Sequence, residues 1–405
     1  MKETTRNKLK DSGIQWIGEI PEHWKVEKAK NLFSLRTSKG NDVLEHLAAT
    51  QTHGMYPQRL LEGVVQVAIN TDYTQFRTVH KNDYVISLRS FQGGFEISEY
   101  EGVCSPAYQV FYNQIPICHN YFKVLFKSVS FIEFMNSLTV GIREGKNIQF
   151  TDFARSYLPV PPLEEQERIS TYLYEKCGEI DELIDVEQQM ISDLESYRQA
   201  IITEAVTHGI TPDVPTKDSN IPQIPLIPKN WVTTKIKFLS NLYSGSNITT
   251  EEITNSGYPV YGGNGLRGFY DRYNKDGEFV LIGRQGALCG NINYAYGKFW
   301  ASEHAIVCHP LIEYHLIWFG ELLRSMNLNQ YSVAAAQPGL SVDKIKNLHI
   351  PVPPLAEQVE IGEYIQGKCS EIDELIKVKQ EKIETLKQYR QSLIFEAVTG
   401  KITIA

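Results

Sequence analysis

The chain contains a long internal repeat, and this repeat restricts the possible folds more than any other feature of the sequence. Residues 158–211 and 350–403 align without a gap at an offset of 192 residues, and 31 of the 54 aligned positions are identical. Both copies begin with PVPPL and continue through EIDELI, YRQ and EAVT. Agreement over this length indicates a duplicated structural element rather than chance similarity.

The segments that precede the two copies are also related, although more loosely. DSGIQWIGEIPEHW ends at Trp24 and DSNIPQIPLIPKNW ends at Trp231, at an offset of 207 residues. The chain therefore consists of two divergent segments, each followed by one copy of the repeat. We predict four parts: domain 1 over residues 1–157, a first spacer helix over 158–211, domain 2 over 212–349 and a second spacer helix over 350–405.

The net charge of −8 would argue against a nucleic-acid partner if it were spread evenly along the chain. Residues 158–211 carry 3 Lys and Arg against 12 Asp and Glu, whereas residues 1–157 carry 18 against 16 and residues 212–349 carry 12 against 11. The two divergent segments also hold 38 of the 44 aromatic residues. Domain 1 and domain 2 are therefore near neutral and can present local basic faces.

Several protein classes are excluded by composition. With 405 residues the chain is long enough for two or three domains with cores of their own. No run of 18 apolar residues predicts a membrane span, and the polar start of the chain shows no secretory signal. The six cysteines include no CxxC pair, which favours a reduced protein over a disulfide scaffold or a zinc ribbon. We expect a cytoplasmic protein without a membrane segment or a bound metal.

Each copy of the repeat predicts one long helix. Proline pairs open the copies at 161–162 and 353–354, and proline is tolerated only in the first helical turn. Gly209 and Gly400 stand where the helices should end, so each helix has about 45 residues and a length of roughly 65 Å. Apolar residues recur at spacings of three and four, which predicts a coiled-coil seam. The predicted seam residues are Leu173, Ile180, Ile184, Glu187, Ile191, Leu194, Ile365, Ile372, Ile376, Lys379, Ile383 and Leu386.

The two helices are expected to pack on each other as an antiparallel pair. In a pair related by a pseudo-twofold axis, equivalent positions meet only at the centre. Near that centre the seam has a polar break, with Glu187 in one copy and Lys379 in the other. These opposite charges are predicted to fix the register. The alternatives are two unrelated surface helices, and two solvated charges at a helix edge.

Domain 1 and domain 2 have mixed patterns. Residues 84–88, 108–112, 279–283 and 305–309 predict strands, and residues 119–139 and 311–326 predict helices. The expected fold class is therefore α+β, with two mixed α/β domains separated by two long antiparallel helices that form a coiled coil.

A strand followed by a glycine loop occurs in both domains, as VISLRSFQGG and VLIGRQG. Each places an arginine, Arg89 or Arg284, at the strand end near a Gln–Gly pair. Arginine and glutamine make bidentate contacts with guanine and adenine edges, and glycine lets the backbone approach a phosphate closely. The competing interpretation is a hairpin turn with a solvent-exposed arginine. A second loop in domain 1, residues 141–147, carries Arg143 and Lys146 and is basic. The corresponding loop of domain 2, residues 334–340, has no charged residue. The candidate DNA-binding residues are Arg89, Ser90, Gln92, Arg143, Lys146, Asn147, Asn264, Arg267, Arg284 and Gln285.

No catalytic constellation is recognisable in the sequence. Residues 263–268 match GxGxxG, but a turn-rich stretch follows where a dinucleotide site needs a helix. The 141–147 loop lacks the spacing and the Ser or Thr of a P-loop. His304, Cys308, His309 and His315 lie close in sequence, and strand and loop packing explains them better than metal ligation. The chain also has no methyltransferase, helicase or nuclease motif, so we predict a protein without a catalytic site.

These motifs carry a family resemblance that covers essentially the whole chain. The two repeat copies resemble the conserved helical regions of the specificity subunits of type I restriction-modification systems, and DSGIQWIGEIPEHW resembles the entry to their first target recognition domain. The resemblance implies a non-catalytic protein that reads a two-part sequence in double-stranded DNA. It also implies two methyltransferase subunits that bring S-adenosylmethionine and two restriction-translocase subunits that bring ATP and Mg²⁺, with no cofactor on this chain.

Two other functions compete with DNA recognition. A coiled-coil scaffold with two interaction domains and no DNA readout would suit the acidic net charge, but not the Arg, Gln and Gly loops. A stand-alone nuclease is disfavoured because no nuclease motif is present. A mobility-shift assay with the methyltransferase partner separates the first alternative, and metal-dependent cleavage by the isolated chain would revive the second.

Overall fold

The computed structural model describes residues 8–40, 45–61, 73–138, 148–286, 288–332 and 339–404. The chain forms two compact units: unit 1 contains Met1–Glu187 and Glu381–Ala405, and unit 2 contains Gln188–Gln380. Both boundaries fall inside long helices, α6 (Leu163–His208) and α9 (Leu355–Val398). The four predicted parts follow the sequence repeat, whereas each unit combines one globular domain with half of each helix.

The globular part of unit 1 (domain 1) is a mixed structure of short elements. Its strands are β1 (Leu9–Asp11), β2 (Glu19–Pro21), β3 (Lys25–Lys28), β4 (Phe33–Leu35), β5 (Leu47–Thr50), β6 (Gly54–Pro57), β7 (Arg77–Val79), β8 (Tyr84–Ile86), β9 (Glu96–Ile97), β10 (Gly102–Cys104), β11 (Gln109–Asn113) and β12 (Tyr157–Val160). Its helices are α1 (Ala29–Leu32), α2 (Ser90–Gly93), α3 (His119–Lys127), α4 (Val129–Leu138) and α5 (Phe150–Arg155).

The globular part of unit 2 (domain 2) contains more strand. Its strands are β13 (Thr216–Ile221), β14 (Ile224–Pro228), β15 (Val232–Lys235), β16 (Ser240–Ser244), β17 (Tyr258–Gly262), β18 (Gly265–Tyr270), β19 (Lys275–Asp276), β20 (Phe279–Gly283), β21 (Ile292–Ala295), β22 (Lys298–Ala301), β23 (Ala305–Pro310) and β24 (His349–Val352). Its helices are α7 (Leu316–Ser325) and α8 (Val342–Ile345).

The two domains share a sheet plan despite their divergent sequences. Domain 1 has a four-stranded sheet in the order β4-β11-β8-β9, and domain 2 has the matching order β16-β23-β20-β21. The hairpin β1–β2 corresponds to β13–β14, and the pair β3–β12 corresponds to β15–β24. Domain 2 then adds a second four-stranded sheet, β18-β17-β22-β19. The duplication therefore includes the domains, and the confirmed fold class is two mixed α/β domains with two long antiparallel helices.

The predicted elements correspond closely to the observed ones, with one difference in domain 1. The run 279–283 is β20, and the runs 84–88, 108–112 and 305–309 overlap β8, β11 and β23. The segment expected to be helical over 119–139 is helical, and the structure divides it into two helices, α3 and α4. They meet at Ser128, whose backbone is extended and whose hydroxyl accepts from the backbone N–H of Phe131 in the next helix. A serine in this position ends one helix and caps another.

The core of domain 1 is built largely from phenylalanine. Phe33, Phe111 and Phe126 are fully buried, and their rings meet edge-on or tilted at centroid distances of 5.5–6.3 Å. Such geometries suit the quadrupole of aromatic rings, so the cluster is stabilised beyond the area it buries. The core of domain 2 is mainly aliphatic, with Trp231 and Trp318 at less than 1% exposure. The core of domain 2 includes residues of the long helices, such as Ile202 and Ile365.

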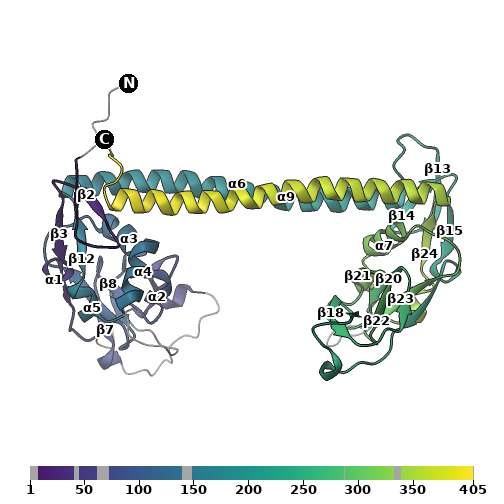
Figure 1. Cartoon of the computed structure of the whole chain (residues 1–405), viewed down its shortest axis with the longest axis horizontal. Coiled ribbons are helices and arrows are strands. Elements are labelled where there is room, and N and C mark those ends of the chain that lie inside the picture. Colours follow the sequence, from purple (N-terminus) through teal and green to yellow (C-terminus); the bar gives the residue numbers. More distant parts are fainter. Residues whose placement is uncertain are drawn as a thin grey trace. The chain divides into compact units, whose positions relative to one another are not determined.

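The long helices begin and end where the sequence predicted. Helix α6 spans 46 residues and α9 spans 44. Gly209 follows α6 with a φ of 84°, which is a left-handed conformation that glycine adopts without strain. Figure 1 shows α9 lying along α6. In unit 1, Arg390 bridges Asp181 at 2.9 Å, and in unit 2, Arg198 bridges Asp373 at 3.0 Å. Residue numbers rise along one helix as they fall along the other, so the pair is antiparallel.

The predicted seam lies along this helix pair, with a burial that differs between its members. Seven of the twelve residues are buried, namely Leu173, Ile180, Ile184, Glu187, Ile365, Ile372 and Ile383. The other five are half-buried, namely Ile191, Leu194, Ile376, Lys379 and Leu386. Glu187 is 4% exposed and accepts a hydrogen bond from Lys382 Nζ at 2.6 Å within unit 1. Lys379 belongs to unit 2, and its pairing with Glu187 stays a prediction.

One glutamine in each repeat copy joins a domain to its long helix. Gln166 donates to the Pro161 carbonyl and accepts from the Cys118 backbone N–H, both at 2.9 Å. In the other copy, Gln358 donates to the Pro353 carbonyl and accepts from the His315 N–H, both at 3.0 Å. Both glutamines are at most 3% exposed. Since Cys118 and His315 are the N-caps of α3 and α7, each glutamine fixes the start of one domain helix, α3 in unit 1 or α7 in unit 2, against a long helix.

A tryptophan packs against the end of a long helix in each unit, with one chemical difference. In unit 2, Trp231 donates from Nε1 to Glu357 Oε1 at 2.9 Å, beside Gly209. In unit 1, the equivalent Trp24 packs beside Gly400, but its Nε1 has no hydrogen-bond partner among the residues described. The equivalent carboxylate, Glu165, instead contacts the imidazole of His23 at 2.8 Å.

The described helices include none that is both long enough and apolar enough to cross a membrane.

Candidate nucleic-acid interface

In domain 2, Arg284 is held at a point where several loops meet. It follows Gly283, the last residue of β20, and its backbone N–H donates to the His304 carbonyl at 2.8 Å. Its own carbonyl accepts from the Leu340 N–H at 2.9 Å. The guanidinium donates from Nη1 to Ser244 Oγ at 3.1 Å and is half-exposed. The backbone of Arg284 is therefore fixed from both sides, while most of its five donors remain available to a ligand.

Two glycines allow the neighbouring loop to approach Arg284. A Cβ on Gly283 would lie 2.2 Å from the Gly263 carbonyl oxygen, and a Cβ on Gly263 would lie 3.2 Å from the Gln285 and His304 carbonyls. Only glycine permits the first of these contacts. The GGNG turn between β17 and β18 is thus pressed against the end of β20. This approach explains the glycine-rich pattern, and it places Asn264 near the arginine loop.

The other predicted residues of domain 2 join the same cluster. Asn264 is exposed, and its Oδ1 accepts from Asn291 Nδ2 at 3.1 Å. Gln285 is exposed and forms a backbone bridge with Gly339. Arg267 is exposed, and its side chain crosses Gly262, where its Cδ would lie 2.4 Å from an added Cβ. The structure therefore places Asn264, Arg284 and Gln285 on adjoining loops and Arg267 on the same hairpin as Asn264. We name this set, with Ser244, Asn291 and His304, the domain 2 loop cluster.

Ser244, Asn291 and His304 were missed by the sequence analysis. They come from three separate segments: the end of β16, the turn before β21 and the turn before β23. No local pattern marks them, because only the pairing of β16, β23 and β20 places their loops together. Predicting these three residues would have required the register of the strands, which the sequence does not show.

In domain 1, the predicted residues lie on a helical turn rather than in an open glycine loop, so the expected loop was wrong there. Arg89 is the N-cap of α2, and both Arg89 and Gln92 are exposed. Ser90 is 1% exposed, and its hydroxyl accepts from the Ser87 N–H at 2.8 Å. The turn ends at Gly94, where an added Cβ would lie 2.0 Å from the Phe126 carbonyl. Arg89 and Gln92 are thus presented to solvent, while Ser90 points inward. Arg143, Lys146 and Asn147 lie outside the described residues.

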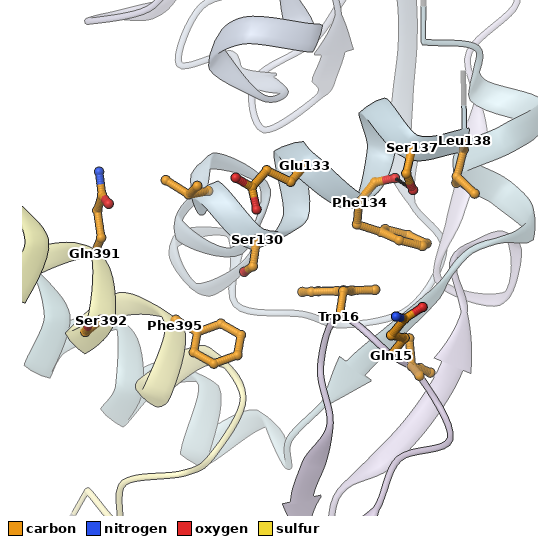
Figure 2. A pocket seen from close by; sticks show the side chains of 12 residues that line it. Gln15, Trp16, Ser130, Glu133, Phe134, Ser137, Leu138, Gln391, Ser392 and Phe395 are labelled. Atoms are coloured by element: carbon orange, nitrogen blue, oxygen red, sulfur yellow. Dashed lines mark hydrogen bonds between the residues drawn. The ribbon is translucent and has the colours of Figure 1, made fainter. Parts of the chain in front are cut away.

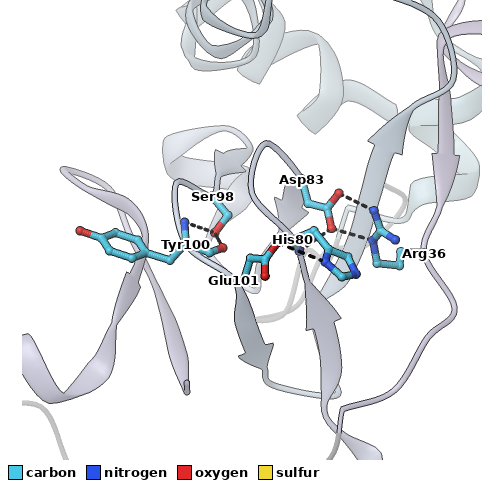
Figure 3. A network of polar contacts seen from close by, with 6 residues as sticks. All are labelled: Arg36, His80, Asp83, Ser98, Tyr100 and Glu101. Atoms are coloured by element: carbon cyan, nitrogen blue, oxygen red, sulfur yellow. Dashed lines mark hydrogen bonds and ion pairs between the residues drawn. The ribbon is translucent and has the colours of Figure 1, made fainter. Parts of the chain in front are cut away.

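A buried ion pair supports the frame of domain 1 (Figure 3). Arg36 donates to both carboxylate oxygens of Asp83, from Nε at 2.6 Å and from Nη2 at 2.8 Å. The Asp83 side chain is 3% exposed and also accepts from the His80 backbone N–H at 2.8 Å. The guanidinium stacks over the Tyr112 ring at 4.5 Å. This arginine therefore holds strands β4 and β8 together.

Exposed apolar residues recur at equivalent positions of the two long helices. Leu183 and Val186 on α6 are 48% and 50% exposed, and their copies on α9, Leu375 and Val378, are 50% and 60% exposed. Tyr197 and Tyr389, also copies of each other, are similarly exposed. Each unit thus carries one such set: Leu183, Val186 and Tyr389 in unit 1, and Leu375, Val378 and Tyr197 in unit 2. We name these sets the helix patches. Their recurrence at equivalent positions of the two copies makes these sets candidates for an interaction surface.

The carboxylates near the helix patches differ in their availability. Asp181 and Asp373 are engaged by Arg390 and Arg198. Glu179 and its copy Glu371 pair with the lysine three residues earlier on their own helix, at 2.7 Å in each case. Glu182 and its copy Glu374 are exposed and have no ion-pair partner in the part of the chain that the structure describes. Within the described part of the chain, only Glu182 and Glu374 of these six carboxylates are therefore free to attract a basic partner.

Unit 1 also contains an apolar groove (Figure 2). Two of its aromatic lining residues are not conserved at the equivalent positions of unit 2. The groove has a volume of about 780 Å³ and is lined by the 14–16 loop, α4 and the last turns of α9. Trp16 stacks on Phe134 with ring centroids 5.4 Å apart. Both rings line the groove together with Phe395. The positions equivalent to Trp16 and Phe395 are Gln223 and Thr203. Of the candidate DNA-binding residues that the structure describes, none lines this groove.

Cys104 in domain 1 and Cys308 in domain 2 are buried packing residues. Burial raises the pKa of the Cys104 thiol to about 12 and raises the pKa of Cys308 as well, so both stay neutral at physiological pH. His309 is half-buried, with a pKa lowered by desolvation. Among the described residues, no group of three or more His, Cys, Asp and Glu side chains is placed to hold a metal ion.

Comparison with known proteins gives a family match over most of the chain. The model of the type I restriction modification DNA specificity domain matches residues 21–195 and again residues 228–388. The chain is 44% identical over 119 residues to the type I restriction enzyme EcoprrI specificity subunit of Escherichia coli, an alignment that covers 29% of this chain and 30% of that subunit. It is 22% identical over 422 residues to the MjaVIII specificity subunit of Methanocaldococcus jannaschii, covering 95% and 94% of the two chains.

Two solved structures share the fold. One, from work on complex assembly and conformational transition of the type I R-M system, superposes with a TM-score of 0.72 at 15% identity and covers 95% of this chain and 99% of that one. The HsdS subunit from Thermoanaerobacter tengcongensis superposes with a TM-score of 0.57 at 16% identity, covering 95% and 98%.

Proposed function

The chain belongs to the family of type I restriction-modification DNA specificity proteins, and we propose that each of its two domains reads one half of a two-part DNA sequence. The observation that carries this proposal is the contrast between the two kinds of repeat. The long helices are nearly the same in both copies, whereas the domains keep one sheet plan and differ in sequence. Two domains that differ in sequence can read two different half-sites, while two similar helices can bind the same kind of partner subunit.

The readout is assigned to the loops at the strand ends. In domain 2, Arg284, Gln285, Asn264 and Arg267 reach solvent from one loop cluster, and in domain 1, Arg89 and Gln92 do so from α2. Arginine recognises guanine, and amide side chains recognise adenine, in the major groove. The relatives of this chain are specificity subunits, which supports a role in recognition without catalysis. The competing scaffold function would leave these exposed arginines without a role.

The partners are two methyltransferase subunits and two restriction-translocase subunits. Each helix patch offers a methyltransferase subunit an apolar stripe flanked by an unpaired carboxylate, Glu182 in unit 1 or Glu374 in unit 2. A partner helix with an apolar face and basic flanks fits such a surface. Because the patches are copies, a partner that binds one is expected to bind the other. S-adenosylmethionine, ATP and Mg²⁺ belong to these partners, and the complex is assigned to the cytoplasm.

A mobility-shift assay of the full chain with its methyltransferase subunits tests the DNA-reading proposal. Arg284→Ala is expected to weaken binding to the cognate duplex by about 1–3 kcal/mol, while binding to unrelated DNA changes little. Arg272→Ala is the matched control, because that arginine lies in the same domain and pairs with the neighbouring Asp271. A complex that binds DNA without any sequence preference would support the scaffold function instead.

Native mass spectrometry tests the partner proposal. Val186→Lys and Val378→Lys should each reduce the bound methyltransferase subunits from two to one, and the double variant should bind none. Asp185→Lys is the control, since its side chain points about 100° away from Val186 around α6. A wild-type complex limited to one methyltransferase subunit would overturn the two-site assignment.

A further inference from the structure

Two asparagines in the domain 2 loop cluster form a side-chain pair that leaves the amide nitrogen of one residue and the amide oxygen of the other without a partner in the described part of the chain. Asn291 Nδ2 donates to Asn264 Oδ1 at 3.1 Å. Asn264 Nδ2 and Asn291 Oδ1 then have no hydrogen-bond partner among the described residues. If both amides were turned over, the pair would still expose one N–H group and one carbonyl oxygen. The pairing thus leaves amide groups of both kinds, a donor on one loop and an acceptor on the other, without a partner in the protein as far as the structure describes it, at two side chains that touch each other.

This arrangement is complementary to one base edge. In the major groove, adenine presents N7 as an acceptor beside the N6 amino group as a donor. Guanine presents two acceptors, thymine an acceptor and a methyl group, and cytosine a donor alone. We infer that the Asn264–Asn291 pair reads an adenine, with the amide N–H group of one residue donating to N7 and the carbonyl of the other accepting from the N6 amino group.

The loops that carry the two asparagines are fixed before any ligand binds. Asn264 stands in the tight β17–β18 turn, which continues through Gly265 at a φ of 94°. The Asn291 carbonyl accepts from the Gly283 N–H at 2.8 Å, which anchors Asn291 to the residue before Arg284. Rigid placement lowers the entropy lost on binding. It also places the adenine reader beside the arginine, so adenine and guanine contacts belong to the same half-site.

The inference rests on the proposed function, because it assumes that domain 2 reads DNA. The two are tested separately by mapping the methylated sequence in cells that carry the complete system. Exchange of residues 212–349 for those of a relative first identifies which half-site domain 2 reads. If that exchange leaves the mapped sequence unchanged, the proposed function fails. If the exchange changes one half-site, the asparagine variants decide the present inference.

Asn264→Ala and Asn291→Ala are each expected to relax one A·T position of that half-site and to leave the other positions intact. Methylation of sites that keep the adenine should slow by about fivefold to 150-fold, which corresponds to the loss of one bidentate contact. Asn264→Asp removes the donors but keeps the shape of the side chain, so it should slow methylation at adenine-containing sites in the same way.

Asn255→Ala is the control, since Asn255 is exposed in the same domain but lies outside the loop cluster. Folding is checked independently by the binding of methyltransferase subunits, which the variants should retain. A half-site without adenine, an unchanged sequence in both alanine variants, or a relaxed position that is not A·T would each overturn the inference.

Discussion

Replacement of Gln358 by leucine should loosen domain 2 from its long helix. Leucine is similar in size but cannot donate to the Pro353 carbonyl or accept from the His315 N–H, which the glutamine contacts at 3.0 Å each. The glutamine is 3% exposed, so both backbone groups would be left buried and unpaired. Each orphaned group costs about 1–3 kcal/mol, and the variant should therefore lose about 2–6 kcal/mol of local stability.

Hydrogen exchange measures this loss at one atom. The His315 amide should exchange at least about 30-fold faster in Gln358→Leu, since 2 kcal/mol corresponds to that factor. Gln166→Leu should have the same effect on the Cys118 amide in unit 1 and leave His315 protected. The control is Gln366→Leu, an exposed glutamine on the same helix. If the His315 amide keeps wild-type protection in Gln358→Leu, the glutamine does not hold the domain.

Three further outcomes are expected. Trp231→Phe should cost about 1.5–3 kcal/mol more than Trp24→Phe in thermal unfolding, because only Trp231 loses a hydrogen bond to a carboxylate; equal costs would refute the assigned difference. Arg36→Leu should cost about 3–5 kcal/mol in the same assay by stranding the buried charge of Asp83, and adding Asp83→Leu should restore most of it. Inserting four residues after Gln188 lengthens α6 by about 6 Å, so methylation mapping should find one or two more base pairs between unchanged half-sites. An unchanged spacer with full activity would show that the helices do not set the distance.

The helices were predictable from the sequence because each depends on local signals. Proline at the start, glycine at the end and apolar spacing in between fixed α6 and α9 to within a few residues. Their antiparallel pairing followed from the repeat. The sequence could not show that Gln166 and Gln358 bind the N-cap residues of α3 and α7. The repeat displays these glutamines, but their partners lie in the divergent segments.

The candidate site was predictable only in part. Arg284 and Asn264 were found because glycine loops mark close approaches of the backbone. Asn291 was missed because only strand register brings it to Asn264, and a register contact leaves no local pattern. Ser90 was expected to face a ligand, yet it is buried because the residues after Arg89 form a helical turn. Short loops are decided by the packing around them, here by the Phe126 carbonyl against Gly94.

The claim that each domain reads its own half-site is tested most directly by a domain exchange. Residues 12–157 are replaced by the matching segment of a relative with a different specificity, while α6, domain 2 and α9 stay unchanged. Methylation mapping of a host that carries the complete system should then show one half-site replaced and the other half-site and the spacer retained. A change in both half-sites, or in neither, would contradict the claim.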